Sequence, residues 1–451
     1  MMKWNRWLLL PLCLVLLFLS GCFFSEGEDL FALPEPPADY LYLQEQLADV
    51  LSSGAEYAAP LAGSSTQPVQ VIDLDGDGTE EALAFFRVSG SEQPLQLYIF
   101  RQTDGVYETE AVISGNASSF RSVTCADLTG NGICEILVGY QMSPNVYQLS
   151  VYSLTDDGPV ETLNASYVKY TLLDIEPDGT TDLVVFYTEA VDQPPSARLY
   201  CHTGPNSIAL HSAALLSAGI GTLNSVSTGL LGDGAPALYA SSSFENNGQI
   251  TDILAMRDGV LTNITLDREL GFSADTLRYH SAGVTDIDSD GVLEVPQPVA
   301  MPAYSASDDT EPEVFWLLNW RRYLLDGSSE PVCTTFHNYQ EGWFLLVPSS
   351  WVDHVTVTRS EIVAGETAYS FGQWNGPDTP PTTFLVIYRL TGADRTNRSH
   401  LGSRFVLYTQ SDVIYAAELT APEIAAAFQI TPENLSDRFC RIITDWSHTD
   451  S

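Results

Sequence analysis

Nine residues, Asp73-Leu74-Asp75-Gly76-Asp77-Gly78-Thr79-Glu80-Glu81, govern the interpretation of this 451-residue chain, because the same pattern returns along the sequence. It recurs at residues 127–135 (DLTGNGICE), 174–182 (DIEPDGTTD) and 286–294 (DIDSDGVLE), and in a degraded form at residues 229–237 (GLLGDGAPA). We name these five segments loops 1 to 5 in chain order, so the degraded copy is loop 4. Their starts are separated by 54, 47, 55 and 57 residues. A period of this length is typical of a repeated supersecondary unit.

Each loop lies between strand-like runs. An apolar run at 69–72 precedes loop 1 and a β-rich run at 82–88 follows it. Later in the unit a third run ends at Asp-Gly, a pair that indicates a hairpin because type I′ turns need positive φ at both central residues. Such pairs stand at 104–105, 157–158, 258–259 and 326–327.

Four antiparallel strands in about 50 residues correspond to one propeller blade. We therefore expect a mainly β fold, with a β-propeller of about five four-stranded blades over residues 66–335. An array of β-sandwiches is the rival solution. It does not readily explain why the same acidic loop returns at the same place in every unit.

The acidic loops have the pattern of a calcium-binding loop. Calcium takes six to eight oxygen ligands, and alternate positions of a tight loop can supply them while glycine at position 6 permits the sharp turn. We expect side-chain oxygens at positions 1, 3, 5 and 9 and the carbonyl oxygen of position 7. The candidate ligands are Asp73, Asp75, Asp77, Thr79 and Glu81 in loop 1; Asp127, Thr129, Asn131, Ile133 and Glu135 in loop 2; Asp174, Glu176, Asp178, Thr180 and Asp182 in loop 3; and Asp286, Asp288, Asp290, Val292 and Glu294 in loop 5.

The copies differ in the strength of this pattern. Loops 1 and 5 keep every carboxylate, whereas loop 2 has a hydroxyl and an amide at two positions and loop 3 has the stiff Pro177 within its turn. Loop 4 retains only Asp233 and is expected to be empty. A single Asp-Gly cluster is usually no more than a solvated turn, but four copies in register favour structural Ca²⁺.

These loops resemble the FG-GAP and VCBS repeats of integrin-type propellers and bacterial surface proteins. The resemblance covers about 270 residues and is carried by the loops, since the Phe-Gly and Gly-Ala-Pro elements of the first family are mostly absent. It implies a propeller, calcium and ligand binding at one propeller face.

The N-terminus has the features of an export signal. Basic Lys3 and Arg6 precede an apolar run, and Leu19-Ser20-Gly21-Cys22 resembles the bacterial lipobox, in which the cysteine is acylated. We expect a lipoprotein signal peptide at 1–21, the lipid anchor on Cys22, and a location at the extracytoplasmic face of the cell membrane. Residues 22–65 read as a proline-bearing tether followed by a short helix near 38–52.

Charge and missing motifs limit the function. The formal net charge of −39 repels nucleic-acid phosphates, so no nucleic-acid partner is expected. The sequence contains no HExxH zinc motif, no GxSxG elbow and no phosphate-cradling glycine loop. We therefore expect a binding or adhesion module for an extracellular protein or glycan rather than an enzyme. The alternatives are a propeller enzyme acting on extracellular polysaccharide and a structural or sensory envelope lipoprotein.

Beyond residue 335 the calcium pattern stops. Residues 336–451 are expected to form a small α+β domain, and Gly342 to Trp351 weakly resembles the opening of PsbP-like domains in secreted Gram-positive proteins. Two smaller features allow two interpretations each. Cys125 and Cys134 could bridge loop 2, although small buried apolar residues are the favoured interpretation. Trp316 and Trp320 could stack on sugar, although a β-rich run favours blade core.

Overall fold

The structure is a computed structural model that describes residues 38–188, 193–204, 206–304 and 313–442. The predicted signal peptide, Cys22 and most of the tether therefore lie outside the described residues. The described chain is mainly β and forms six antiparallel sheets of four or five strands.

The sheets follow one another in chain order, and we number them accordingly. The first sheet contains β1 (Ala55–Tyr57), β2 (Val69–Ile72), β3 (Glu81–Val88), β4 (Leu95–Thr103) and β5 (Val106–Gly115). The second contains β6 (Ser119–Ala126), β7 (Glu135–Ser143), β8 (Val146–Thr155) and β9 (Gly158–Tyr167). The third contains β10 (Lys169–Leu173), β11 (Asp182–Tyr187), β12 (Ser196–Gly204) and β13 (Ser207–Leu215). The fourth contains β14 (Leu223–Leu230), β15 (Pro236–Phe244), β16 (Gly248–Arg257) and β17 (Val260–Asn263).

The last two sheets have five strands each. The fifth is ordered β18 (Val295–Ala300), β19 (Trp316–Tyr323), β20 (Ser329–Asn338), β21 (Trp343–Val347) and β27 (Phe439–Arg441). The sixth is ordered β22 (Val355–Val363), β23 (Glu366–Gln373), β24 (Thr382–Thr391), β26 (Val413–Leu419) and β25 (Phe405–Thr409). The α-helices are α2 (Ala38–Ser52), α3 (Arg395–Arg398), α4 (Pro422–Ala427) and α5 (Pro432–Arg438), and 3-10 turns occupy Ala274–Thr276 and Ser349–Trp351.

The Asp-Gly pairs join consecutive strands, as the sequence predicts. Asp104 and Gly105 have φ of 53° and 82°, and Asp258 and Gly259 have φ of 53° and 73°. Positive φ at both central residues is the signature of a type I′ hairpin. At 157–158 and 326–327 only the glycine has a positive φ, so these two connections are of another type.

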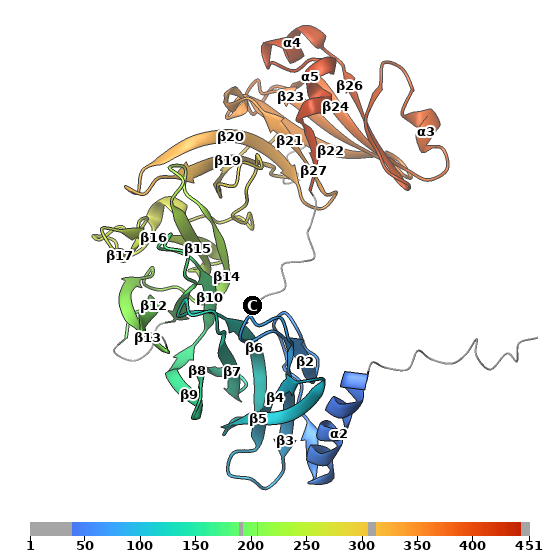
Figure 1. Cartoon of the computed structure of the whole chain (residues 1–451). Coiled ribbons are helices and arrows are strands. Elements are labelled where there is room, and N and C mark those ends of the chain that lie inside the picture. The colour runs from blue at the N-terminus through green and yellow to red at the C-terminus, as the bar shows by residue number, and fades with distance from the viewer. Residues whose placement is uncertain (1–37, 189–192, 205, 305–312, 443–451) are drawn as a thin grey trace, which may run out of the picture.

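The sheets stack face to face along an arc, each one contacting the next (Figure 1). Successive residues of a strand point to opposite faces, and in β3 Phe85 belongs to the core shared with the second sheet while Phe86 belongs to the core beneath α2. Strands buried on both faces read as continuous apolar runs, which is why 82–86 is uninterrupted by polar residues. The stack begins with α2, which packs Leu43 and Leu47 on the first sheet.

The fifth sheet is shared between the repeat region and the C-terminal region. The expected boundary at residue 335 falls within β20, and the sheet continues through β21 to β27 near the end of the described chain. One core cluster joins Leu317 and Phe336 of the fifth sheet to Phe371 and Leu385 of the sixth. The C-terminal residues therefore form the next layer of the stack, with α4 and α5 at its side.

A buried carboxylate of the fourth sheet holds the segment that connects the third sheet to the fourth. Asp252 on β16 accepts hydrogen bonds from the Ser217 backbone N–H at 2.9 Å and the Ser217 hydroxyl at 2.6 Å. It also accepts from the Ser273 hydroxyl at 2.6 Å and from Asn263 Nδ2 at 2.8 Å. Three chain segments therefore meet at one side chain that has no solvent exposure.

Candidate functional site: the acidic loops

The acidic loops occupy the same place in successive sheets. Loops 1 to 4 each connect two consecutive strands that pair with each other, namely β2 to β3, β6 to β7, β10 to β11 and β14 to β15. Loop 5 leads into β18, and a bridge between Thr285 and Glu294 stands in place of a full first strand. The position of the loops in the sequence repeat is therefore also their position in the fold.

The glycine at position 6 adopts the same left-handed conformation in all five copies. Glycine at position 6 has φ between 84° and 87° in every loop, at Gly78, Gly132, Gly179, Gly234 and Gly291. L-residues with a side chain rarely adopt this conformation. The turn therefore requires glycine at position 6, including in the degraded loop 4.

Side-chain oxygens hold this turn by accepting backbone N–H groups. The carboxylate at position 1 accepts from position 6 in loops 1, 2, 3 and 5, at distances between 2.8 and 3.0 Å. The side chain at position 5 accepts from position 7 in the same loops, at 2.7 to 2.8 Å. These bonds orient the predicted ligands of positions 1 and 5 toward the loop interior.

The carboxylate at position 9 is buried in all four acidic loops, at Glu81, Glu135, Asp182 and Glu294. One of its oxygens accepts the N–H of position 2, from Leu74, Leu128, Ile175 and Ile287 respectively, at 2.8 to 3.2 Å. Burial disfavours the charged form, and it raises the pKa of all four carboxyl groups. Each copy thus holds a carboxylate whose second oxygen needs a partner.

The second oxygen separates the four loops into two classes. In loop 2, Glu135 Oε1 accepts the Ser153 hydroxyl at 3.1 Å and the Thr129 hydroxyl at 3.4 Å. In loop 3, the Cys201 thiol hydrogen-bonds to Asp182. In loops 1 and 5, by contrast, Oε1 of Glu81 and of Glu294 is buried and has no hydrogen-bond partner among the described residues.

The strand that pairs with the one starting at or just after position 9, namely β4, β8, β12 or β19, explains this difference. It places Ser153 beside position 9 in the second sheet and Cys201 in the third, and both donate to the carboxylate. The corresponding residues in the first and fifth sheets are Arg101 and Arg322, and neither donates a hydrogen bond to Oε1 of Glu81 or Glu294. Arg101 binds Asp75 and Glu110 at 2.6 and 2.9 Å, and Arg322 binds Glu330 at 3.1 Å.

The same two loops gather acidic ligand atoms. The ligand atoms of Asp73, Asp75 and Glu81 in loop 1, and of Asp286, Asp288 and Asp290 in loop 5, lie within 4.8 Å of one another. Within the described ranges, no other group of three histidine, cysteine or acidic side chains comes this close. Glu176 of loop 3 lies instead 3.7 Å from His211 Nε2.

The negative charge of loop 5 is less compensated by nearby basic residues than that of loop 1. Arg101 neutralises part of loop 1, whereas the carboxylates of Asp288, Asp290 and Asp286 add to burial and raise the pKa of Glu294 to about 7. A divalent cation would remove this repulsion, because it favours every carboxylate in its charged form. Loop 5 is thus the site at which a cation changes the local electrostatics most.

Loop 4 has a different role from the other copies. Asp233 Oδ2 accepts the N–H of Leu325 at 2.9 Å, and the N–H of Gly232 donates to the carbonyl of Tyr323 at 2.8 Å. The remaining acid of this loop therefore caps the turn between β19 and β20. Sequence reasoning assigned Asp233 to an empty calcium loop and had no means of detecting a partner 92 residues away.

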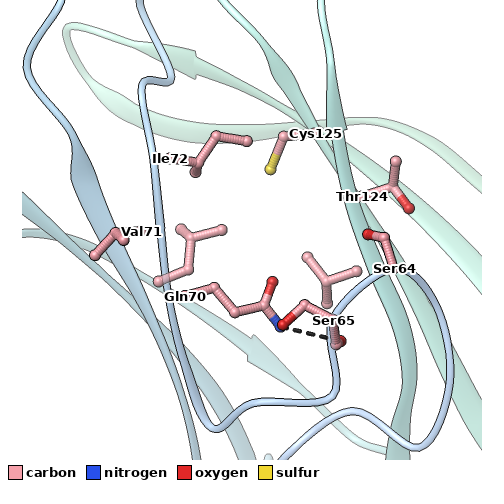
Figure 2. A pocket seen from close by; sticks show the side chains of 9 residues that line it. Ser64, Ser65, Gln70, Val71, Ile72, Thr124 and Cys125 are labelled. Carbon is pink, nitrogen blue, oxygen red and sulfur yellow. Dashed lines mark hydrogen bonds between the residues drawn. The ribbon is translucent and has the colours of Figure 1, made fainter.

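A cavity of about 320 Å³ lies between the inner strands of the first two sheets. Ser64, Ser65, Gln70, Thr124 and Cys125 contribute its polar groups, and the sulfur of Cys125 points into it (Figure 2). Cys125 and Cys134 are free thiols and half-buried, as are Cys201, Cys333 and Cys440. Gln70 Nε2 donates to the Ser65 carbonyl at 3.2 Å across one side of the cavity.

In the part of the chain that the structure describes, no helix has the length and apolarity needed to cross a membrane.

Comparison with known proteins gives only distant structural similarity. No family profile and no curated protein matches this chain. A crystal structure of a protein from Lactobacillus plantarum is 9% identical, with a TM-score of 0.25, and the match covers 72% of this chain and 88% of the other. AofleA from Arthrobotrys oligospora is 7% identical, also with a TM-score of 0.25, over 75% of this chain and 85% of the other.

Proposed function

We propose that this chain is a lipid-anchored, extracytoplasmic binding protein whose β-propeller is stabilised by Ca²⁺ at loops 1 and 5. The observation that carries the calcium part is the buried, unpartnered Oε1 of Glu81 and Glu294, which are 1% and 0% exposed. An ion held by the surrounding carboxylates would satisfy both oxygens. Loops 2 and 3 have hydroxyl or thiol donors at the same place and need no ion.

The proposed ligands are those that the loop turn already orients. In loop 1 they are the carboxylates of Asp73, Asp75 and Glu81, and in loop 5 those of Asp286, Asp288 and Asp290 with Glu294 behind them. Hard carboxylate oxygens are the donors that calcium prefers. The ion would neutralise clustered charge and fix the start of β3 and β18, which is a structural role.

The propeller part rests on how the units repeat in space. Sheets one to five each carry the loop at the corresponding position, and each sheet buries both faces against its neighbours along the arc (Figure 1). We assign these five sheets as blades and the sixth as a C-terminal layer that packs on the last blade. An assembly of this kind presents loops at its rims, where ligands of propellers bind.

The binding role is proposed from the resemblance of the repeats to those of propellers that bind ligands at one face, and the conspicuous acids have a structural use. The buried carboxylates at position 9 accept backbone N–H groups and so build the fold. We therefore assign the chain to extracellular protein or glycan binding, with attachment to the membrane through lipid on Cys22 and without nucleic acid as a partner.

Matched substitutions at position 9 test the calcium assignment. Glu294→Gln and Glu81→Gln should each remove part of the rise in melting temperature that calcium produces, because each removes a charged oxygen that has no protein partner. Glu135→Gln is the control, since its second oxygen already accepts Ser153 and Thr129. Binding to the folded state alone contributes about 2.7 kcal/mol at a hundredfold excess over Kd, which a thermal melt detects. A melting temperature that changes neither with added calcium nor with chelator would refute the assignment.

A further inference from the structure

A cluster of aromatic and imidazole rings lies at the surface where the fourth and fifth sheets meet. The His280 ring lies 5.5 Å from Trp316 and 6.3 Å from Tyr339, and Tyr339 lies 5.1 Å from His337. We call these four residues the ring cluster. Tyr339 is 46% exposed, and Trp316 and His280 are half-buried. Trp320, in contrast, is buried and donates to Thr335 at 2.7 Å, so it belongs to the core.

An arginine without an acidic partner lies next to the ring cluster. Arg278 is 3% exposed, and its Nε donates to the Ala282 carbonyl at 2.7 Å. Its Nη1 donates to the Thr251 hydroxyl at 3.0 Å and the Thr276 carbonyl at 3.1 Å, and its Nη2 has no partner among the described residues. Burial lowers the pKa of this guanidinium to about 10, so it stays charged at neutral pH.

No acidic side chain among the described residues pairs with these groups. The hydrogen bonds of Arg278 all go to neutral acceptors, and no described carboxylate contributes to the pKa of His280, His337 or Tyr339. The positive charge of Arg278 is therefore not neutralised by a direct partner within the described residues.

The histidines of the cluster are neutral. Burial and the neighbouring positive charge lower the pKa of His280, and burial lowers that of His337 to about 4. Their rings are therefore uncharged faces at neutral pH. Nδ1 of His280 is buried and has no partner within the described chain, which leaves one polar atom at the cluster unsatisfied.

We propose that the ring cluster binds a pyranose sugar that carries a carboxylate. The apolar C–H face of a pyranose stacks on aromatic rings, and the field of Arg278 favours a negative substituent that the rest of this acidic surface repels. The inference deepens the proposed binding function by naming its ligand class, and it rests on that function.

Binding of trigalacturonate to the full chain in detergent tests the proposal. Calorimetry and tryptophan fluorescence should show binding, and the methyl ester of the same trisaccharide should bind at least about tenfold more weakly, because it lacks the charge. Tyr339→Ala should weaken binding about tenfold, equivalent to about 1.4 kcal/mol. Tyr339→Phe keeps the ring and should retain binding. Tyr42→Ala on α2 is the matched control, with the same 46% exposure at the other end of the chain.

Three outcomes would overturn the inference. These are no binding of either saccharide, equal binding of the acid and its ester, and loss of binding in Tyr42→Ala as large as in Tyr339→Ala. An acidic peptide that binds in place of the sugar would also exclude it. The calcium response is measured on the same samples. If calcium stabilises the protein but the saccharide does not bind, this inference is refuted and the calcium assignment stands.

Discussion

Asp252→Asn tests whether one buried carboxylate holds the segment between the third and fourth sheets against the fourth sheet. In the wild-type chain Oδ1 accepts Ser217 Oγ, Asn263 Nδ2 and Ser273 Oγ, while Oδ2 accepts the Ser217 backbone N–H. An asparagine can present only one oxygen to these donors. With its oxygen at the Oδ1 position, its NH₂ group faces the Ser217 N–H.

The expected loss in the free energy of unfolding follows from this geometry. One charge-assisted hydrogen bond disappears, at about 1.5 to 3 kcal/mol, and two buried donors are left facing each other, at about 1 to 3 kcal/mol. The three remaining bonds weaken because their acceptor is neutral. Relief from burying a charge offsets part of this loss. We expect a net destabilisation of about 3 to 5 kcal/mol.

Urea denaturation followed by tryptophan fluorescence measures this change. Asp267→Asn is the control, because Asp267 also accepts two backbone N–H groups, from Glu269 and Leu270 at 2.8 and 3.1 Å, but on an exposed turn. The free energy of unfolding of the control should fall by less than about 1 kcal/mol. A loss of that same size in Asp252→Asn would contradict the reasoning that the buried carboxylate joins these chain segments.

Three further substitutions test other parts of the structure. Gly291→Ala should lower the free energy of unfolding by about 1 to 2 kcal/mol in a thermal melt, because its φ of 87° is strained for any residue with a Cβ, although no neighbouring atom obstructs one. The free energy of unfolding should fall by up to about 3 kcal/mol as pH falls from 6.5 to 4. The pKa of His337 is about 4 in the folded chain, so the unfolded state takes up the proton first. His337→Phe should flatten this part of a stability–pH profile. Cys22→Ala should leave the protein unlipidated, and unchanged partitioning of this variant into detergent would contradict the anchor.

The repeat was predictable from sequence because its signals are local. Gly78 and its four equivalents mark the turn, and Asp104-Gly105 marks a hairpin, since both depend on backbone conformations that few residue types adopt. The apolar runs around them are also local signals, and they predict strands. The joining of β27 to β21 was not predictable, because Cys440 and Phe344 are paired across 96 residues and neither carries a local signal of this contact.

The candidate sites were likewise only partly predictable from the sequence. The acids of loops 1 and 5 stand out in the sequence, but the decision between an ion and a protein donor depends on Ser153 and Cys201, which lie on another strand. The ring cluster was harder still to foresee. Trp316 and Trp320 stand four residues apart in one run, and only the packing of the fifth sheet shows that the first is half-exposed and the second is core.

Loop 4 shows what the shared turn implies for the kinetics of metal exchange. Its glycine has the same φ as the others although most of the acids are absent, so bending of the backbone does not depend on a charged ligand set. A cation entering loop 1 or loop 5 would therefore meet a turn that is already bent and would need only small side-chain adjustments. Uptake and release should then be fast and reversible, and the stability of the protein should follow the free calcium concentration in a titration without any delay from refolding.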